Sequence, residues 1–216
     1  IIASPANPTG SIINKSNMLD ISKWCSKNNI RIISDEIYHG IEYENRSNTF
    51  LSLNKNSIVI NSFSKYFCMT GWRLGWIIAP KEIISIIEKL SMACFLCPPT
   101  ISQMAAIKVF DDYSELDKNV SIYKKNRDLL VNVFEKIGLK NYASPDGAFY
   151  LYVDITSIAK DSSSLALSLL NDIGISSTPG VDFDKNLGKN FIRFSYAGST
   201  KRIAEASQRI KNWIKK

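Results

Sequence analysis

Histidine and cysteine are scarce in this sequence. There is one histidine, His39, and the four cysteines are Cys25, Cys68, Cys94 and Cys97. A structural zinc site needs four such ligands at regular spacing, and the single C-x-x-C pair has no second pair and no histidine near it. That pair closes an apolar helical run, whereas a thioredoxin-like motif opens a helix. We therefore expect no metal site and interpret the cysteines as buried or half-buried structural thiols, which suit a reducing compartment.

Long apolar runs are also absent. No stretch approaches the ~20 apolar residues that a bilayer-spanning helix needs, and no signal peptide is visible. These absences favour a cytoplasmic protein without a membrane partner. The chain does not begin with methionine, and its first residues read as the inside of a strand. We expect that an N-terminal part is missing.

The composition is that of a folded protein. The 216 residues are 45% hydrophobic and 22% charged, which is enough apolar material for a sizeable core. The net charge is +7, from 27 basic and 20 acidic residues. The lysines are mixed with acids in helical segments such as "ELDKNVSIYKKNRDLL", a pattern typical of solvated helix faces. No nucleic-acid motif accompanies them, so we expect no nucleic-acid partner.

Strands and helices alternate in the first half of the chain. Ser16 is the expected cap of the first helix. Alternation of this kind predicts an α/β fold, with helices flanking a mostly parallel sheet. Only about ten residues separate the third and fourth strands, too few for a crossover helix, so the fourth strand should be antiparallel. The expected strands are 1–4, 30–34, 57–63 and 74–79, and the expected helices are about 17–28, 81–95 and 100–112.

A long helix is expected over about 115–137, and the order of strands and helices changes after it. Two expected strands, 147–155 and 190–198, are each followed by a capped helix, at 162–174 and at the C-terminus from 199. This order predicts a smaller α+β domain. We place the portion of the larger domain at 1–115 and the smaller domain at 116–216.

Polar side chains follow three successive strands of the predicted sheet. In open α/β sheets, ligands bind outside the carboxyl ends of the strands, so these residues should converge on one site. In chain order they are Asn7 after the first strand, Asp35 and Tyr38 after the second, and Ser62, Ser64 and Lys65 at the end of the third.

These residue types suit one small molecule. The amine of a lysine such as Lys65 can bond an aldehyde when it is desolvated. Two hydroxyls and a guanidinium, those of Ser62, Ser64 and Arg73, suit a phosphate. A carboxylate such as Asp35 suits a protonated ring nitrogen. An aldehyde, a phosphate and a pyridinium together describe pyridoxal 5'-phosphate (PLP).

Five motifs occur in an order and spacing that resemble one enzyme family. They are "NPTG", "SDEIYHG", "NSFSKYFCMTGWRLGW", "PDGAFY" and "FIRFSYAGS", and they span almost the whole chain. The chain resembles the fold-type I, class I/II aminotransferases, the aspartate aminotransferase-like family. The resemblance implies a PLP-dependent transaminase that moves an amino group between an L-amino acid and a 2-oxo acid.

The resemblance also implies roles for residues that contact the cofactor. Lys65 would carry PLP as a Schiff base and then move the substrate proton. Asp35 would pair with the ring nitrogen and keep it protonated. Asn7 and Tyr38 would hydrogen-bond the phenolic oxygen.

Two further groups complete the implied site. Ser62, Ser64 and Arg73 would hold the phosphate. Arg193, in "FIRFSY", would bind the substrate carboxylate through a two-pronged salt bridge, with Asn7 beside it. His39 is interpreted as a packing residue, or one that supports the site from behind, rather than as a catalytic one.

One departure from the family leaves alternatives open. Family members are longer, and their preceding portion supplies further strands, a phosphate-binding loop and a tyrosine that is exchanged between the two subunits of a homodimer. The chain could therefore be a catalytically incomplete fragment. A PLP-dependent C–S lyase with the same fold is the other alternative, because fold and cofactor site do not separate the two reactions.

Overall fold

The computed structural model describes residues 1–215, which form two compact units. Unit 1 consists of Ile1–Pro5 and Ile12–Lys118, and unit 2 consists of Ala6–Ser11 and Asn119–Lys216. The division between them falls inside the long helix α4 (Ser114–Lys136). The segment Ala6–Ser11 was expected in the first domain. It groups with unit 2 because the amide of Gly147 donates to the carbonyl of Gly10 at 2.8 Å.

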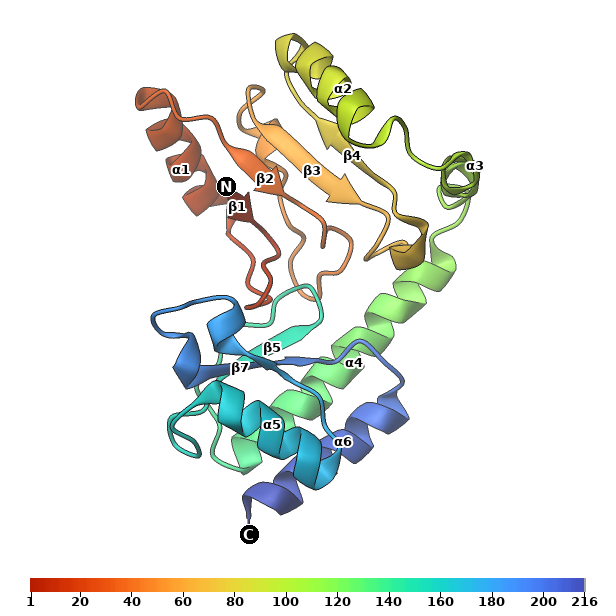
Figure 1. Cartoon of the computed structure of the whole chain (residues 1–216). Helices are drawn as coiled ribbons and strands as arrows, with labels where there is room; N and C mark the ends of the chain where they lie inside the picture. The colour runs from red at the N-terminus through yellow and green to blue at the C-terminus, as the bar shows by residue number, and fades with distance from the viewer. Residues whose placement is uncertain (216) are drawn as a thin grey trace. The chain divides into compact units, whose positions relative to one another are not determined.

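Unit 1 is built on a four-stranded sheet in the order β1-β2-β3-β4 (Figure 1). Its first three strands are parallel and the fourth is antiparallel to the third, as the short connection predicted. This arrangement confirms the expected α/β fold. The strands are β1 (Ile2–Ala3), β2 (Ile33–Asp35), β3 (Ile58–Ser62) and β4 (Gly75–Ile78).

The helices of unit 1 follow the apolar periodicity of the sequence. They are α1 (Lys15–Lys27), α2 (Lys81–Phe95) and α3 (Thr100–Lys108), with short 3₁₀ turns η1 (Phe50–Ser52) and η2 (Thr70–Trp72). Figure 1 shows α1 near β1 and β2, and α2 and α3 near β4. One apolar cluster packs α1 against the sheet through Met18, Cys25, Ile32 and Phe50. A second cluster, around Phe63, Met69 and Ala106, packs α3 beneath the segment that follows β3.

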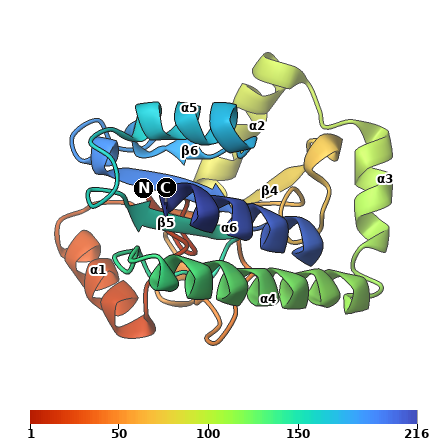
Figure 2. The ribbon, with the colours of Figure 1, turned by 90° about the horizontal axis from the view of Figure 1, so that it is seen from below.

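Unit 2 is a three-stranded antiparallel sheet in the order β5-β7-β6. Its strands are β5 (Tyr150–Asp154), β6 (Thr178–Pro179) and β7 (Phe191–Ser195), and its helices are the second part of α4, α5 (Ser162–Ile173) and α6 (Thr200–Ile214). The turns η3 (Gly180–Asp182) and η4 (Gly188–Asn190) lie between β6 and β7. The helices cover one face of the sheet (Figures 1 and 2). Ile192 and Phe194 of β7 point into this core, so the alternation of side chains along a strand turns Arg193 to the opposite face.

Several local expectations were wrong. The cap of α1 is Asn14, whose side chain accepts from the amide of Asn17, while Ser16 only donates to that side chain. β2 begins at Ile33 and not at residue 30. α3 ends at Lys108 and not at residue 112, because the chain forms a turn there in which the amide of Asp111 donates to the carbonyl of Lys108.

The expectation about the cysteines also fails in large part. Cys25 is buried in the α1 cluster, whereas Cys68, Cys94 and Cys97 are exposed. Cys94 lies in the last turn of α2, a helix with no buried residue, and Cys97 lies two residues beyond its end.

Among the helices of residues 1–215, none combines the length and the apolar character needed to cross a membrane.

Candidate active site

The predicted pyridinium partner, Asp35, is the last residue of β2. It pairs with Ile60 of β3 in parallel register. Its Oδ1 accepts from the amide of Ile37 at 3.1 Å, and its carbonyl accepts from the amide of Ser4 at 3.2 Å. The carboxylate is partly exposed at the carboxyl end of the sheet, where a ligand can reach it.

The predicted phosphate-binding residues lie at the end of β3, in the case of Ser62, and on the loop that follows it. The amide of Ser64 donates to the hydroxyl oxygen of Ser62 at 3.0 Å, and the two hydroxyl oxygens are also 3.0 Å apart. Arg73 donates from its guanidinium to the carbonyl of Thr70 at 2.9 Å, and Thr70 in turn donates its hydroxyl to the carbonyl of Ser64 at 2.6 Å. This loop therefore holds two hydroxyls and a guanidinium in a fixed, self-bonded arrangement.

Lys65 lies on the same loop, and its position is set by the residues on either side. Its Nζ is 5.8 Å from the centroid of the buried Tyr38 ring, so two of the predicted catalytic side chains are neighbours. Tyr66 donates its hydroxyl to Asp117 at 2.6 Å. Its ring packs on Gly40, where an added Cβ would come within 2.6 Å of a ring carbon. Burial, together with the hydrogen bond and charge of Asp117, raises the pKa of Tyr66, so its hydroxyl stays protonated and keeps donating.

Two predicted residues belong to unit 2. The guanidinium of Arg193 donates to Oδ1 of Asn7 at 2.5 Å and to the hydroxyl of Thr178 at 3.0 Å. Its Cζ lies 4.2 Å from the ring centroid of Tyr150 and 4.8 Å from that of Phe183, in contacts of the cation–π type.

One polar atom of this group has no partner. The Nε atom of Arg193 is buried and makes no hydrogen bond within residues 1–215. A buried donor without an acceptor is costly, and an anionic ligand would supply the acceptor. This observation points to a carboxylate or phosphate site at Arg193.

Sequence reasoning missed the residues that hold Arg193 in place. Thr178 lies directly opposite Arg193 in the pairing of β6 with β7. β6 is only two residues long, so it contains no run of β-branched residues that would predict a strand. Alternation in "GAFYLYVDI" could have placed Tyr150 on the same face of the strand as Tyr152, which pairs with Arg193. The contact of Phe183 with Arg193 has no signal in the local sequence.

Comparison with known proteins identifies the family of the chain. Residues 1–210 match the family model described as aminotransferase class I and II. The chain belongs to the aminotransferase class I and II family.

Individual relatives resemble the chain over part of their own length. The valine–pyruvate aminotransferase of Mycobacterium tuberculosis is 41% identical over 99% of this chain and 56% of its own length. The (5-formylfuran-3-yl)methyl phosphate transaminase of Methanocaldococcus jannaschii is 38% identical over 100% of this chain and 57% of its own length. The crystal structure of an aminotransferase from Mycobacterium tuberculosis superposes with a TM-score of 0.95 at 41% identity, over 99% of this chain and 57% of that one. The chain thus spans little more than half the length of the relatives it matches.

Proposed function

We propose that the protein is a PLP-dependent aminotransferase that moves an amino group between an L-amino acid and a 2-oxo acid. The single observation that best supports this function is the loop after β3, which carries Lys65 beside Tyr38 and sets the hydroxyls of Ser62 and Ser64 3.0 Å apart. The relatives named above are transaminases, which favours transamination over C–S lysis.

The residues of unit 1 fit PLP in chemical type. Hydroxyls and a guanidinium on one loop suit its phosphate, a carboxylate on the neighbouring strand suits its ring nitrogen, and an amine on the same loop suits its aldehyde. When bound, PLP supplies an electron sink for negative charge at the substrate Cα. We propose that Lys65 bonds the cofactor covalently and carries the proton to and from that carbon, while Asp35 keeps the ring nitrogen protonated.

The remaining residues bind and orient. We propose that Ser62, Ser64 and Arg73 hold the phosphate and that the Tyr38 hydroxyl binds the phenolic oxygen. In unit 2 we propose that Asn7 contributes to the cofactor and substrate site and that Arg193 binds the substrate carboxylate. Support for the last role comes from the buried, unpartnered Nε of Arg193 and the aromatic rings that hold the guanidinium plane.

We further propose that the protein acts as a homodimer in the cytoplasm. α2 has no buried residue and exposes Ile86, Leu90 and Phe95, each more than half accessible. An apolar face of this kind is a candidate for burial against further polypeptide, such as a second subunit. The exposed thiols of Cys94 and Cys97 suit a reducing compartment.

The decisive experiment is chemical trapping. Purified protein is incubated with PLP and reduced with borohydride, and the modified peptide is mapped by mass spectrometry. The test uses this chain and, where the gene encodes a longer polypeptide, that polypeptide as well. A stoichiometric adduct confined to Lys65, lost in Lys65→Ala and kept in Lys81→Ala, supports the proposal. Labels scattered over many lysines in both forms overturn it.

The reaction type is tested on the same sample. Incubation with an amino acid should yield the matching 2-oxo acid together with pyridoxamine phosphate. Pyruvate released with ammonia or sulfide would instead assign the protein to the lyases. Equal turnover by Lys65→Ala would contradict both reactions as proposed here.

A further inference from the structure

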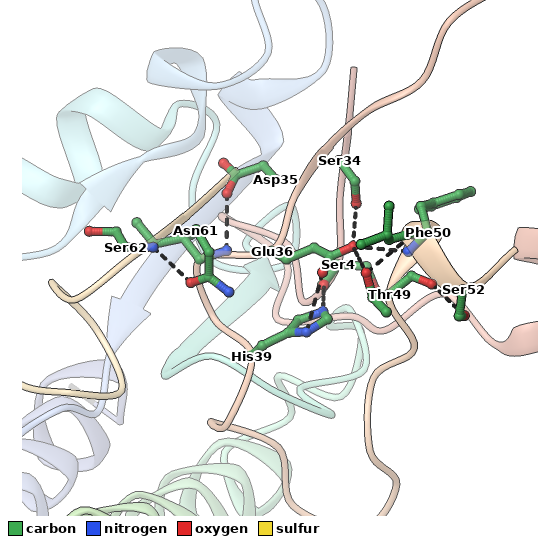
Figure 3. A network of polar contacts seen from close by, with 12 residues as sticks. Ser4, Ser34, Asp35, Glu36, His39, Thr49, Phe50, Ser52, Asn61 and Ser62 are labelled. Carbon is green, nitrogen blue, oxygen red and sulfur yellow. Dashed lines mark hydrogen bonds and ion pairs between the residues drawn. The ribbon is translucent and has the colours of Figure 1, made fainter. Parts of the chain in front are cut away.

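A buried carboxylate lies next to Asp35 and has no part in the proposed chemistry. Glu36 is 3% exposed. Its Oε1 accepts three hydrogen bonds, from the hydroxyls of Ser34 and Thr49 and the amide of Phe50, each at 3.0 Å. Figure 3 shows these donors gathered around Glu36, while the Asp35 carboxylate points away from them. The alternation of side chains therefore gives adjacent acids different surroundings.

The imidazole of His39 continues this network. Its Nδ1 is 3.5 Å from Oε2 of Glu36, and its Nε2 is 3.1 Å from the carbonyl oxygen of Ser4. A carbonyl oxygen only accepts hydrogen bonds, so Nε2 must carry a hydrogen. His39 thus bridges a buried carboxylate and the backbone at the end of β1.

The backbone around Asp35 is tied to the same network. The amide of Ser4 donates to the carbonyl of Asp35 at 3.2 Å, and the amide of Glu36 donates to the carbonyl of Ile60 at 2.9 Å. The residue that accepts from His39 is therefore also the one that fixes the Asp35 carbonyl. These contacts hold the peptide unit that follows Asp35, one at its carbonyl and one at its amide.

Stability alone is a weak explanation for such a network. Burying a charged group is costly, and apolar residues of similar volume often stabilise a fold as well or better. A buried, fully bonded polar network instead imposes one arrangement on the groups around it. Here that arrangement includes the peptide unit that follows Asp35.

We propose that Glu36 and His39 are positioning residues that hold the Asp35 carboxylate in the orientation needed to bond the ring nitrogen of the cofactor. This inference rests on the proposed function, in which Asp35 keeps that nitrogen protonated. Glu36 fixes the turn after β2 through Thr49 and Phe50, and His39 fixes the end of β1 through Ser4. Loosening either contact lets the Asp35 carboxylate turn away from the ring nitrogen.

The test uses Glu36→Gln and His39→Gln, with Met18→Ala as the matched control. Met18 is fully buried in the α1 cluster and is not part of the Glu36 network, so its truncation destabilises unit 1 without removing a contact to Asp35. PLP labelled with ¹⁵N in the ring is bound to the purified protein, and the ¹⁵N chemical shift reports whether the ring nitrogen is protonated. The dissociation constant of PLP is measured by titration, at a temperature where all variants are folded.

We expect a protonated ring nitrogen in the wild type and in Met18→Ala. In Glu36→Gln and His39→Gln the shift should move toward the unprotonated value. The PLP dissociation constant should rise about 10-fold, the lower end of the effect seen when outer hydrogen-bond partners are removed at metal sites. Because the two variants break different contacts, His39→Gln still tests the proposal if Glu36→Gln does not fold.

A cofactor-free measurement adds a second readout. In the ¹H–¹⁵N spectrum of the imidazole, identified by its loss in His39→Gln, Nε2 should carry the proton. An unprotonated Nε2 would overturn the bridge to Ser4.

The possible outcomes distinguish the positioning role of Glu36 and His39 from the proposed function. A wild type that binds PLP with a protonated ring nitrogen, together with variants that match Met18→Ala, overturns the positioning role alone. A wild type that binds no PLP at Lys65 overturns the proposed function, and the positioning role with it.

Discussion

Arg193 and Asn7 are 186 positions apart in the chain and share a hydrogen bond of 2.5 Å between a guanidinium NH and Oδ1 of the amide. Both belong to unit 2, although Asn7 lies only four residues after β1 of unit 1. The same guanidinium donates to Thr178 and lies against two aromatic rings. Arg193 is thus held on several sides before any ligand arrives, which lowers the entropic cost of binding an anion.

This pair makes a double-mutant cycle informative. We expect Arg193→Lys to raise the apparent KM for amino acids by about 10- to 100-fold, because a lysine cannot form the two-pronged bond and charged hydrogen bonds contribute about 1.5–3 kcal/mol. The affinity for PLP should stay within a factor of about three, because Arg193 is assigned to the substrate and not to the cofactor. A threefold change in affinity corresponds to less than about 1 kcal/mol.

The second arm of the cycle uses Asn7→Ala. Its effect on KM should shrink in the Arg193→Lys background, since the two side chains bond each other. The measurement is steady-state KM and kcat for the four proteins, with PLP binding measured in parallel. Loss of PLP binding in Arg193→Lys at unchanged KM would show that its assigned role is wrong.

Arg73 offers a test that isolates the cofactor phosphate. Arg73→Gln should weaken the binding of PLP by about 10- to 100-fold, the effect of losing one charged hydrogen bond. The binding of pyridoxal, which has no phosphate, should change little. Arg73 has a left-handed backbone with φ of 51°, and glutamine at this position must adopt the same conformation. The comparison therefore measures the effect of the side chain.

The matched control for Arg73 is Arg31→Gln. It removes the same charge from the segment just before β2, at the amino end of that strand, away from the carboxyl ends where the loop after β3 begins. Equilibrium dialysis with both ligands gives the two ratios. If pyridoxal binding fell as much as PLP binding, a phosphate-specific role for Arg73 would be excluded.

Gly180 tests the packing of the turns in unit 2. A Cβ at this position would lie 2.4 Å from the carbonyl of Gly188, 2.6 Å from that of Phe191 and 2.7 Å from the hydroxyl of Tyr152. Two of these atoms are backbone and cannot move aside cheaply. We expect Gly180→Ala to lower the free energy of unfolding by about 1–3 kcal/mol, as overpacked substitutions do.

The control for Gly180 is Gly198→Ala, where the nearest atom to an added Cβ is 3.9 Å away. Chemical denaturation followed by circular dichroism measures both variants. Equal stability of the two would contradict the close approach of the two turns.

Much of the fold was predictable because local signals and tertiary packing agree. The short connection after β3 correctly predicted an antiparallel β4, and the apolar periodicity of 81–95 matches α2 at both ends. Asn14 and Ser16 both carry capping side chains at the start of α1, so sequence alone could not decide between them.

The surroundings of the candidate site were harder to predict. The sequence motifs indicated Asp35 and Arg193. Two donors to Glu36, however, come from the cap and the first residue of η1, and two partners of Arg193 come from the two-residue strand β6 and the turn at Phe183. Such contacts depend on how distant segments pack, and neither a two-residue strand nor a 3₁₀ turn has a periodicity to detect.

The last prediction concerns pH and the start of α5. Asp161 caps this helix, and its Oδ2 accepts from the amide of Ser164 at 2.7 Å. The hydrogen bonds from Ser164, backbone first, lower the pKa of Asp161 below its ordinary value of 3.8. A carboxylate whose pKa is lower in the folded state adds stability above its unfolded pKa and loses it as pH falls through the folded value.

We therefore expect the contribution of Asp161 to be fully present above about pH 5 and to fade below pH 4. Asp161→Asn is the matched variant, because asparagine caps a helix but does not titrate. Thermal unfolding of both proteins between pH 3 and pH 7 measures the difference in Tm. The advantage of the wild type over Asp161→Asn should shrink as the pH is lowered. A difference that stays constant across this range would mean that the cap does not depend on the ionised carboxylate.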